Sequence, residues 1–286
     1  MVAQRIKLTR APARNCVLQA AEVPELERDE AAAIATVELS RILDLIGSLS
    51  TEEWYRPTVN PGWPVRDVVA HLCGLNAIYA HWGEGLRQLL GAWRHRELGL
   101  VDAANATQVA ARRDWTPAEL TAALAADGPR CIRFRHLVPG PLRRLPVVLP
   151  IAGVRPASYF WDTLYTRELW MHRLDIARAT DREPVVTADH DGRLVALVLR
   201  DLAQSLPDGL GRDVTVYFEL SGPAGGNWDV GPGDVPDVTI RLDAIDFVWL
   251  SAGRTTPAEL ERANAVEYAG NPALGSRALV LSRVLF

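Results

Sequence analysis

The stretch that reads TRELWMHRLDIA, residues 166–177, most constrains what this chain can fold into. It places Glu168 and His172 four residues apart and Asp175 three residues further on. On an α-helix these spacings put all three side chains on one face, and apolar residues fall around the same side. Because burial of a charge without a partner is costly, a divalent metal is the simplest explanation for such a face. Carboxylate oxygens and neutral imidazole nitrogens both bind zinc-type ions.

A second stretch offers another ligand. Residues 63–75 contain Pro64, which suits a first helical position, followed by apolar residues at steps of three and four. This pattern is typical of an amphipathic helix, and His71 lies beside its apolar stripe. Together with Glu168 and His172, His71 would complete a set of two histidines and one carboxylate from two helices. A fourth position would stay open for water, a thiol or a substrate. The competing explanation is that Glu168 and His172 form an ordinary surface ion pair.

The two stretches together resemble a known family. The pattern W-x-V-R-D-x-x-A-H-L at residues 63–72 is followed, about a hundred residues later, by E-L-W-x-H-R-x-D at residues 168–175. This combination is similar to that of the mycothiol-dependent maleylpyruvate isomerase family, within the DinB-like metalloenzyme superfamily. The resemblance covers most of residues 30–286. It implies a mainly α protein with an N-terminal four-helix bundle and a small α+β domain similar to sterol carrier protein 2. It also matches His71, Glu168 and His172 to the three metal ligands.

The resemblance implies a metal-dependent enzyme that activates mycothiol, a low-molecular-weight thiol, with zinc as the expected ion. A coordinating metal lowers the pKa of a thiol, and the thiolate would attack an electrophilic small molecule. Two outcomes stay open, cis–trans isomerisation and S-transfer, because both use the same ligands. Alternatives are a zinc-dependent hydrolase with water in the open position, and a non-enzymatic binding module with a structural metal.

Three further residues are candidates for the site. Asp175 is the candidate catalytic residue, because it could accept a hydrogen bond from a ligand histidine; it could equally pair with a neighbouring arginine, Arg173 or Arg178. Arg254 and Arg277, in the second domain, could bind a substrate carboxylate. We expect a pocket bounded by the metal, segment 138–156 and the second domain. The remaining histidines, His81, His95, His136 and His190, are expected on the surface or in loops.

Composition excludes some partners. The chain has 31 Lys and Arg against 35 Asp and Glu, a net charge of −4, which gives no reason to expect nucleic acid or an anionic membrane. No apolar run reaches the ~18 residues of a membrane helix, and no hydrophobic signal core follows the basic N-terminus. We therefore expect a cytoplasmic monomer or homodimer. The three cysteines are too scattered for a disulfide framework, and Cys73 is expected to be a packing residue.

The expected organisation is a loose arm at residues 1–28, the bundle at 29–183 and the α+β domain at 187–286. In the bundle we expect helices at 29–48, from residue 64 to about 94, at 116–126 with a resumption after Pro129, and at 156–180. Residues 97–114 are expected to form a loop, and 138–156 an ordered crossover or lid. In the second domain we expect helices at 189–206, 244–251 and 271–286, a helix start at Thr256, strands at 214–220 and 238–242, and a glycine-rich hairpin at 222–233.

Overall fold

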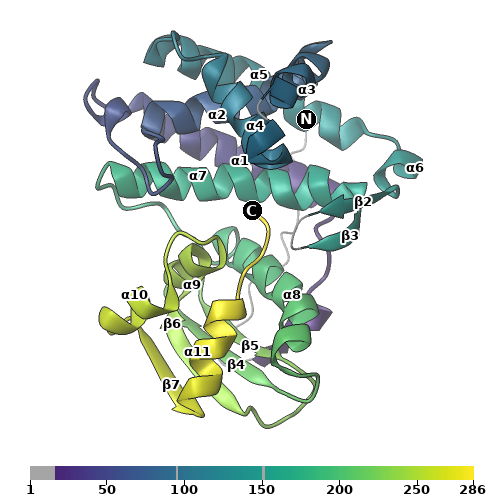
Figure 1. Ribbon diagram of the computed structural model, residues 1–286, viewed down its shortest axis with the longest axis vertical. Helices are drawn as coiled ribbons and strands as arrows, with labels where there is room; N and C mark the ends of the chain where they lie inside the picture. Colours follow the sequence, from purple (N-terminus) through teal and green to yellow (C-terminus); the bar gives the residue numbers. More distant parts are fainter. Residues whose placement is uncertain (1–16, 95, 150–151) are drawn as a thin grey trace, which may run out of the picture. The chain divides into compact units, whose positions relative to one another are not determined.

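The computed structural model describes residues 17–94, 96–149 and 152–286. The chain divides into two compact units (Figure 1). The bundle unit comprises Glu27–Leu145 and Pro156–Pro184, and the C-terminal unit comprises Met1–Leu26, Pro146–Arg155 and Val185–Phe286. Within the described part of the chain, no helix is both long enough and apolar enough to cross a membrane.

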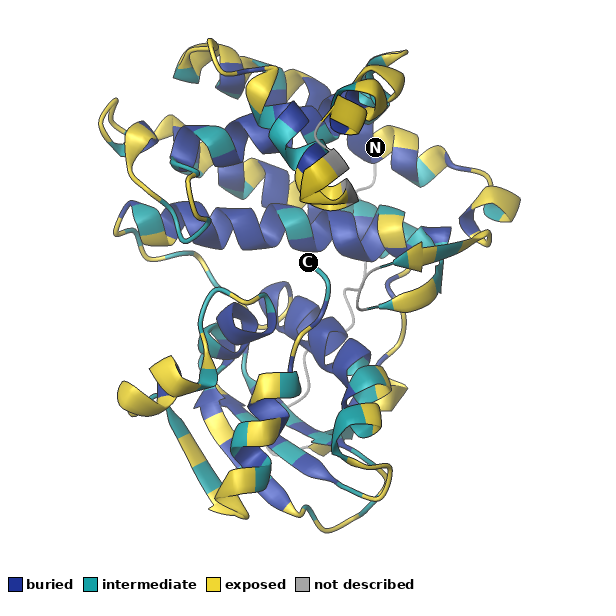
Figure 2. Cartoon of the chain, viewed as in Figure 1, coloured by how far each residue is buried: buried dark blue, intermediate teal, exposed yellow. Residues whose placement is uncertain are grey.

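Four long helices form the bundle unit, as expected for the DinB-like class. They are α1 (Arg28–Gly47), α2 (Val65–Ala80), α5 (Pro117–Leu137) and α7 (Tyr165–Ala179). Helix α5 packs against α1 and α2, and α7 packs against α1 and α2. Their apolar stripes meet in one core, and α7 is buried along nearly its whole length (Figure 2). The core includes Ile42, Leu72, Leu120, Leu124 and Leu169, all fully buried.

The region after α2 differs from the sequence-based expectation of one long helix followed by a loop. The backbone is extended at His81, and Gly83 has a φ of +83°, so α2 ends and a separate helix α3 (Glu84–Arg94) begins. A short 3-10 turn, η3 (Arg96–Leu98), then leads into α4 (Leu100–Ala110). Hydropathy missed α4 because its buried side consists of small and polar residues rather than a strong apolar stripe.

Helix α5 is continuous, whereas the sequence predicted an interruption at Pro129. Its start was predicted correctly: the Thr116 hydroxyl accepts from the backbone N–H of Glu119, and the Glu119 carboxylate accepts from the backbone N–H of Thr116. Gly128 lies so close to α1 that a Cβ there would come 2.4 Å from Leu39. Tertiary packing therefore holds the helix through the proline, overriding local preference.

Segment 138–156 is ordered where it is described. It contains the short helix α6 (Gly140–Arg143) and two strands, β2 (Pro146–Leu149) and β3 (Gly153–Pro156), which form a two-stranded sheet. A π-helical stretch, η4 (Tyr159–Leu164), then runs directly into α7. The segment's expected role as a lid stays a prediction.

The C-terminal unit is an α+β structure, as predicted. Its five-stranded sheet has the order β1-β5-β4-β6-β7. The strands are β1 (Val17–Gln19), β4 (Val216–Ser221), β5 (Gly226–Val230), β6 (Val238–Asp243) and β7 (Val266–Gly270). Strand β4 pairs in parallel with β6, and β1 in parallel with β5; the β4–β5 and β6–β7 pairs are antiparallel.

Alternation along the strands separates two faces of this sheet. Val216, Phe218 and Leu220 of β4 are buried, while Glu219 between them is half-exposed. Helices α8 (Asp191–Leu210), α9 (Ala244–Ser251) and α11 (Pro272–Leu281) contact the strands, and α10 (Pro257–Arg262) packs on α11. The remaining short elements are η1 (Ala20–Glu22) in this unit and η2 (Glu53–Tyr55) in the bundle unit.

The expectation of a loose N-terminal arm needs correction for residues 17–26. Strand β1 adds to the sheet edge beside β5, Ala20 is fully buried, and Arg193 donates to the carbonyls of Pro24 and Glu25 at 3.1 Å. A three-residue strand carries too little pattern to be found alone, because its partner lies some two hundred residues away in the sequence. Residues 1–16, including Cys16, lie outside the described residues.

Candidate metal centre

Two facing helices bring the three predicted ligands together. His71 lies on α2, and Glu168 and His172 lie one turn apart on α7. Their ligand atoms all lie within 4.8 Å of one another. Glu168 Oε2 is 3.1 Å from His172 Nε2 and 3.6 Å from His71 Nε2, and the two imidazole rings meet edge to face with centroids 5.0 Å apart. Such a group of atoms could converge on one ion.

The three side chains of the cluster differ in how far they are exposed to solvent. The side chains of His71 and His172 are 3% and 6% exposed, whereas that of Glu168 is 28% exposed. The Trp63 ring lies against His71, with centroids 5.4 Å apart. The histidines are therefore enclosed by the bundle core, and the cluster reaches solvent at Glu168.

His71 gives a direct test of whether the cluster fits a metal. Among the described residues, neither of its ring nitrogens has a hydrogen-bond partner. A buried polar atom left without a partner costs roughly 1–3 kcal/mol. A divalent ion bound by one of these nitrogens would satisfy it. Two imidazoles and one carboxylate also match the three-ligand sets of catalytic zinc sites, which leave the fourth position open.

The charges in the cluster stabilise one another. Burial alone would raise the pKa of Glu168, but its hydrogen bond to His172 and the imidazole of His71, 3.6 Å away, hold that pKa well below its usual value. For His172, burial acts to lower the pKa, but hydrogen bonds to Asp175 and Glu168 raise it to about 9. Without a metal, the cluster thus holds an ionised carboxylate beside a protonated imidazole.

Asp175 contacts His172 at the ring nitrogen that faces away from Glu168, and Asn60 in turn contacts Asp175. Asp175 is fully buried, and its Oδ2 lies 2.9 Å from His172 Nδ1. Asn60 Nδ2 donates to the same oxygen at 2.9 Å. This arrangement keeps a proton on Nδ1 and turns Nε2 toward Glu168, so that Nε2 is the nitrogen available to an ion, as outer carboxylates do for histidine ligands. Arg173, which the sequence offered as an alternative partner of Asp175, pairs with Glu38 at 2.7 Å.

Asn60 could not be found from the sequence. It lies in the loop between η2 and α2, where Trp63 N–H donates to its carbonyl at 3.0 Å and its own N–H donates to the Thr58 hydroxyl at 3.1 Å. No periodic pattern links this loop to α7. The only local signal was its turn composition, which predicts a turn but no partner.

A comparison with models of known protein families shows to which family the chain belongs. The family model described as mycothiol maleylpyruvate isomerase N-terminal domain matches residues 35–177, half of the chain. The chain belongs to this family. The match begins inside α1 and ends inside α7, so it includes the residues that carry all three predicted ligands.

Relatives of this family member are of two kinds. Two uncharacterised proteins of Mycobacterium tuberculosis, from strains CDC 1551 / Oshkosh and ATCC 25618 / H37Rv, are each 28% identical over 226 residues, which is 78% of this chain and 84% of theirs. Crystal structures of the mycothiol-dependent maleylpyruvate isomerase and of a histidine-to-alanine mutant of it are similar, with TM-scores of 0.54 and 0.53. At 17% identity, over 88% of this chain and 96% of theirs, this likeness shows the fold.

The two described cysteines of this family member, Cys73 and Cys131, are buried. Cys73 is buried on α2, and its thiol donates to the Leu120 carbonyl at 3.3 Å. Burial raises the pKa of Cys73 to about 12 and also raises the pKa of the buried Cys131. A thiol with a raised pKa is a poor nucleophile at neutral pH. Neither residue therefore suits the role of an attacking thiolate.

Among the described residues, the metal-type cluster contains none of the remaining histidines, and Arg254 and Arg277 belong to the C-terminal unit. His81 pairs with Asp127 at 2.8 Å and His136 with Asp29 at 2.7 Å. His190 lies in the turn just before α8, which fits the expected loop position, but it is buried rather than on the surface, and His95 lies outside the described residues. Arg254 follows α9, and Arg277 of α11 donates to the Gly209 carbonyl at 2.7 Å. Their binding of a substrate carboxylate stays a prediction.

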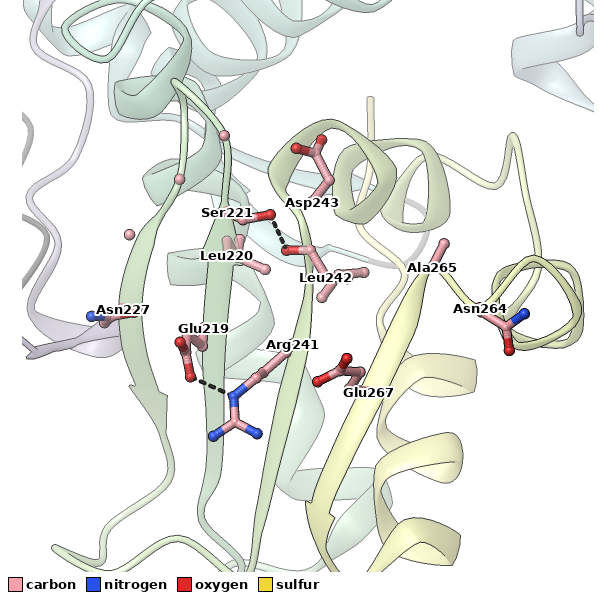
Figure 3. Close-up of a pocket in the computed structure, with 13 residues that line it drawn as sticks. Glu219, Leu220, Ser221, Asn227, Arg241, Leu242, Asp243, Asn264, Ala265 and Glu267 are labelled. Atoms are coloured by element: carbon pink, nitrogen blue, oxygen red, sulfur yellow. Dashed lines mark hydrogen bonds and ion pairs between the residues drawn. The ribbon is translucent and has the colours of Figure 1, made fainter.

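A pocket of about 460 Å³ opens in the C-terminal unit and is lined by none of the three predicted ligands. It lies over the half-exposed face of β4, β5, β6 and β7, with Glu219, Asn227, Arg241 and Glu267 among its lining (Figure 3). The Glu219 carboxylate and Arg241 Nε pair across it at 2.7 Å. The pocket expected between the metal, segment 138–156 and the second domain is a separate prediction that stays open.

Proposed function

We propose that this protein is a metal-dependent, mycothiol-dependent isomerase acting on a small electrophilic molecule. The observation that carries the proposal is the convergence of His71, Glu168 and His172 on the buried faces of two helices, in a chain of this family. The orphaned nitrogens of His71 support a bound divalent ion, with zinc the expected one. The proposal takes mycothiol from the name of the family and of the solved relatives.

The residues of this chain would act in distinct ways. His71, Glu168 and His172 would hold the ion, which when bound lowers the pKa of the cosubstrate thiol so that a thiolate exists at neutral pH. Asp175 keeps the proton of His172 on Nδ1 and leaves Nε2 as the ligand atom. Core side chains around the two histidines exclude water, while the exposed edge of Glu168 marks where the thiol and the substrate would enter.

The proposed reaction conserves all atoms. The thiolate adds to one carbon of a conjugated C=C bond, and the electron pair moves onto the activating carbonyl. The former double bond is then single and can rotate. Collapse of the enolate restores the double bond in the other geometry and expels the thiolate unchanged. Protonation of the enolate instead of expulsion would leave an S-conjugate, which is the transferase outcome.

The test uses purified full-length protein loaded with zinc, with maleylpyruvate as the first electrophile. We expect isomerisation that requires both mycothiol and metal, with mycothiol recovered unchanged. The His172→Ala variant should lose metal and turnover while keeping its helical circular-dichroism spectrum. A stable mycothiol conjugate would instead identify a transferase. Turnover of a panel of amides and esters without any thiol would contradict the proposal and point to a hydrolase.

A further inference from the structure

Helix α3 presents its apolar side to solvent. Leu86, Leu89, Leu90 and Trp93 recur at steps of three and four residues, which places them on one face of the helix. They are 58–67% exposed, and Trp82, in the turn before the helix, is fully exposed. We call these five residues the α3 apolar face.

The opposite side of α3 is fixed against the bundle by polar and small residues. The buried amide of Gln88 donates to the Gly74 carbonyl at 2.9 Å and accepts from Gln108 at 2.9 Å. A Cβ at Gly91 would come 2.4 Å from Thr107 of α4, so the two helices cross very closely. Rotating the leucines inward would break the Gln88 hydrogen bonds and place large side chains at this crossing. The outward direction of the apolar face is therefore built into the packing.

Charge distribution favours an identical partner over a membrane. Arg87, at the flank of the face, donates to both carboxylate oxygens of Glu84 at 2.6 Å, which neutralises the pair. Two copies of the face can then approach without like-charge repulsion at this flank, and Arg94 stands at the far end of the helix. A helix that lies in an anionic membrane needs a basic polar face. The polar side of α3 carries Gln88 and is packed against protein.

The size of the face also fits a dimer. Two tryptophans can bury up to ~150–250 Å² each. Together with the three leucines, the face has on the order of 600–700 Å² of apolar surface that a partner could bury. Isolated apolar patches on monomers are usually smaller than this or functional. A stable interface buries roughly 800 Å² per partner, so the face would supply most of that area and the polar side chains around it would supply the rest. We propose that the α3 apolar face binds the same face of a second copy of this chain across a twofold axis, which requires a self-complementary surface.

The test is the oligomeric state of the full chain by sedimentation velocity from about 1 to 100 µM. We expect a species of twice the 31.4 kDa chain mass. The double variant Leu86→Glu, Leu90→Glu should be monomeric, because it brings like charges together at the axis. The matching variant Leu86→Lys, Leu90→Lys should also be monomeric alone. An equimolar mixture of the two should restore the dimer. Leu137→Glu, at the end of α5 and equally exposed, is the matched control and should stay dimeric.

Several results would overturn the proposal. These are a wild-type chain that stays monomeric at 100 µM, a dimer that persists in both charged double variants, or oppositely charged variants that do not associate when mixed. Co-flotation of monomeric wild-type protein with phosphatidylcholine–phosphatidylglycerol vesicles, lost in the Leu86→Glu, Leu90→Glu variant, would assign the face to lipid instead. Because the substituted side chains are exposed, each variant should keep its helices, and circular dichroism checks this.

Discussion

Asp175 and Asn60 decide which nitrogen of His172 is available as a ligand. The carboxylate of Asp175 lies 2.9 Å from both His172 Nδ1 and Asn60 Nδ2. The sequence could suggest Asp175, because it follows His172 at a helical spacing, but it left open a pairing with arginine. The amide of Asn60 comes from a loop, and only the folded chain places it there. Residue spacing therefore predicts groups on one helix and misses those that support them from elsewhere.

We predict that Asp175→Asn lowers zinc affinity by about 10–100-fold, because the variant loses the charge that orients His172 and strengthens it as a ligand. Asn60→Ala should have a smaller effect in the same direction. Competition with a chromogenic chelator measures the affinity. Asp127→Asn is the matched control, since it alters another carboxylate that contacts a histidine, His81, outside the cluster. Unchanged zinc affinity in Asp175→Asn would contradict this role.

A second prediction concerns the chain's own thiols. Burial raises the pKa of Cys73 to about 12 and raises that of Cys131. At pH 8 Cys73 should therefore stay protonated and react with iodoacetamide at least about 100-fold more slowly in the folded protein than in urea, and Cys131 should also react more slowly than in urea. Peptide mapping by mass spectrometry follows each cysteine separately. Fast alkylation of Cys73 in the folded protein would contradict its packing role.

At the scale of elements, strong apolar periodicity was a reliable guide. It predicted α1, α2, α7 and α8, because each buries a continuous stripe of large side chains. It failed where helices meet through small or polar groups. Helix α4 buries Ala103, Thr107 and Gln108, and its close approach depends on glycines of other helices. Those contacts join different helices, so the local periodicity of a single stretch of sequence cannot reveal them.

The π-helical stretch η4 is an element that the sequence did not predict. Arg135 of α5 donates to the carbonyl of Trp161 at 2.7 Å and to that of Phe160 at 3.0 Å, and its guanidinium stacks 3.7 Å from the Tyr165 ring centroid. π-Helical turns often occur at functional sites. Here the stretch immediately precedes the helix of Glu168 and His172, and Arg135 anchors it to α5.

We therefore predict that Arg135→Gln destabilises the protein by about 2–4 kcal/mol, because it removes the donors to two partly buried carbonyls and a buried stacking group. Urea unfolding monitored by circular dichroism measures the change. Arg130→Gln on the same helix is the control; its side chain is 61% exposed, and the change should stay within about 0.5 kcal/mol. Equal effects of the two substitutions would contradict the role given to Arg135.

At the scale of the whole molecule, the chain combines a DinB-like bundle with an α+β unit, and the sequence predicted both. The boundary near Pro184 lies in the loop between α7 and α8, and the strand periodicity of the second unit begins only after α8, at β4. Residues 17–26 were misplaced because they join the C-terminal sheet from the other end of the chain. The two units can each be understood from their own cores.

A fragment of residues 27–184 tests what the bundle does alone. Because it carries His71, Glu168 and His172, we predict that it retains the zinc content of the full chain, measured by inductively coupled plasma mass spectrometry. A folded fragment without zinc would contradict the assignment of all ligands to the bundle. The earlier expectation of a site shared with the second domain predicts that the fragment loses turnover.

The most direct test of the central claim is the absorption spectrum of the cobalt-substituted full chain on addition of mycothiol. If His71, Glu168 and His172 hold the ion and leave one position for the thiol, mycothiol should produce a near-ultraviolet sulfur-to-cobalt charge-transfer band. The band should be absent in His172→Ala and unchanged in Cys73→Ala. A cobalt-loaded wild-type protein that shows no such band at saturating mycothiol would contradict the account.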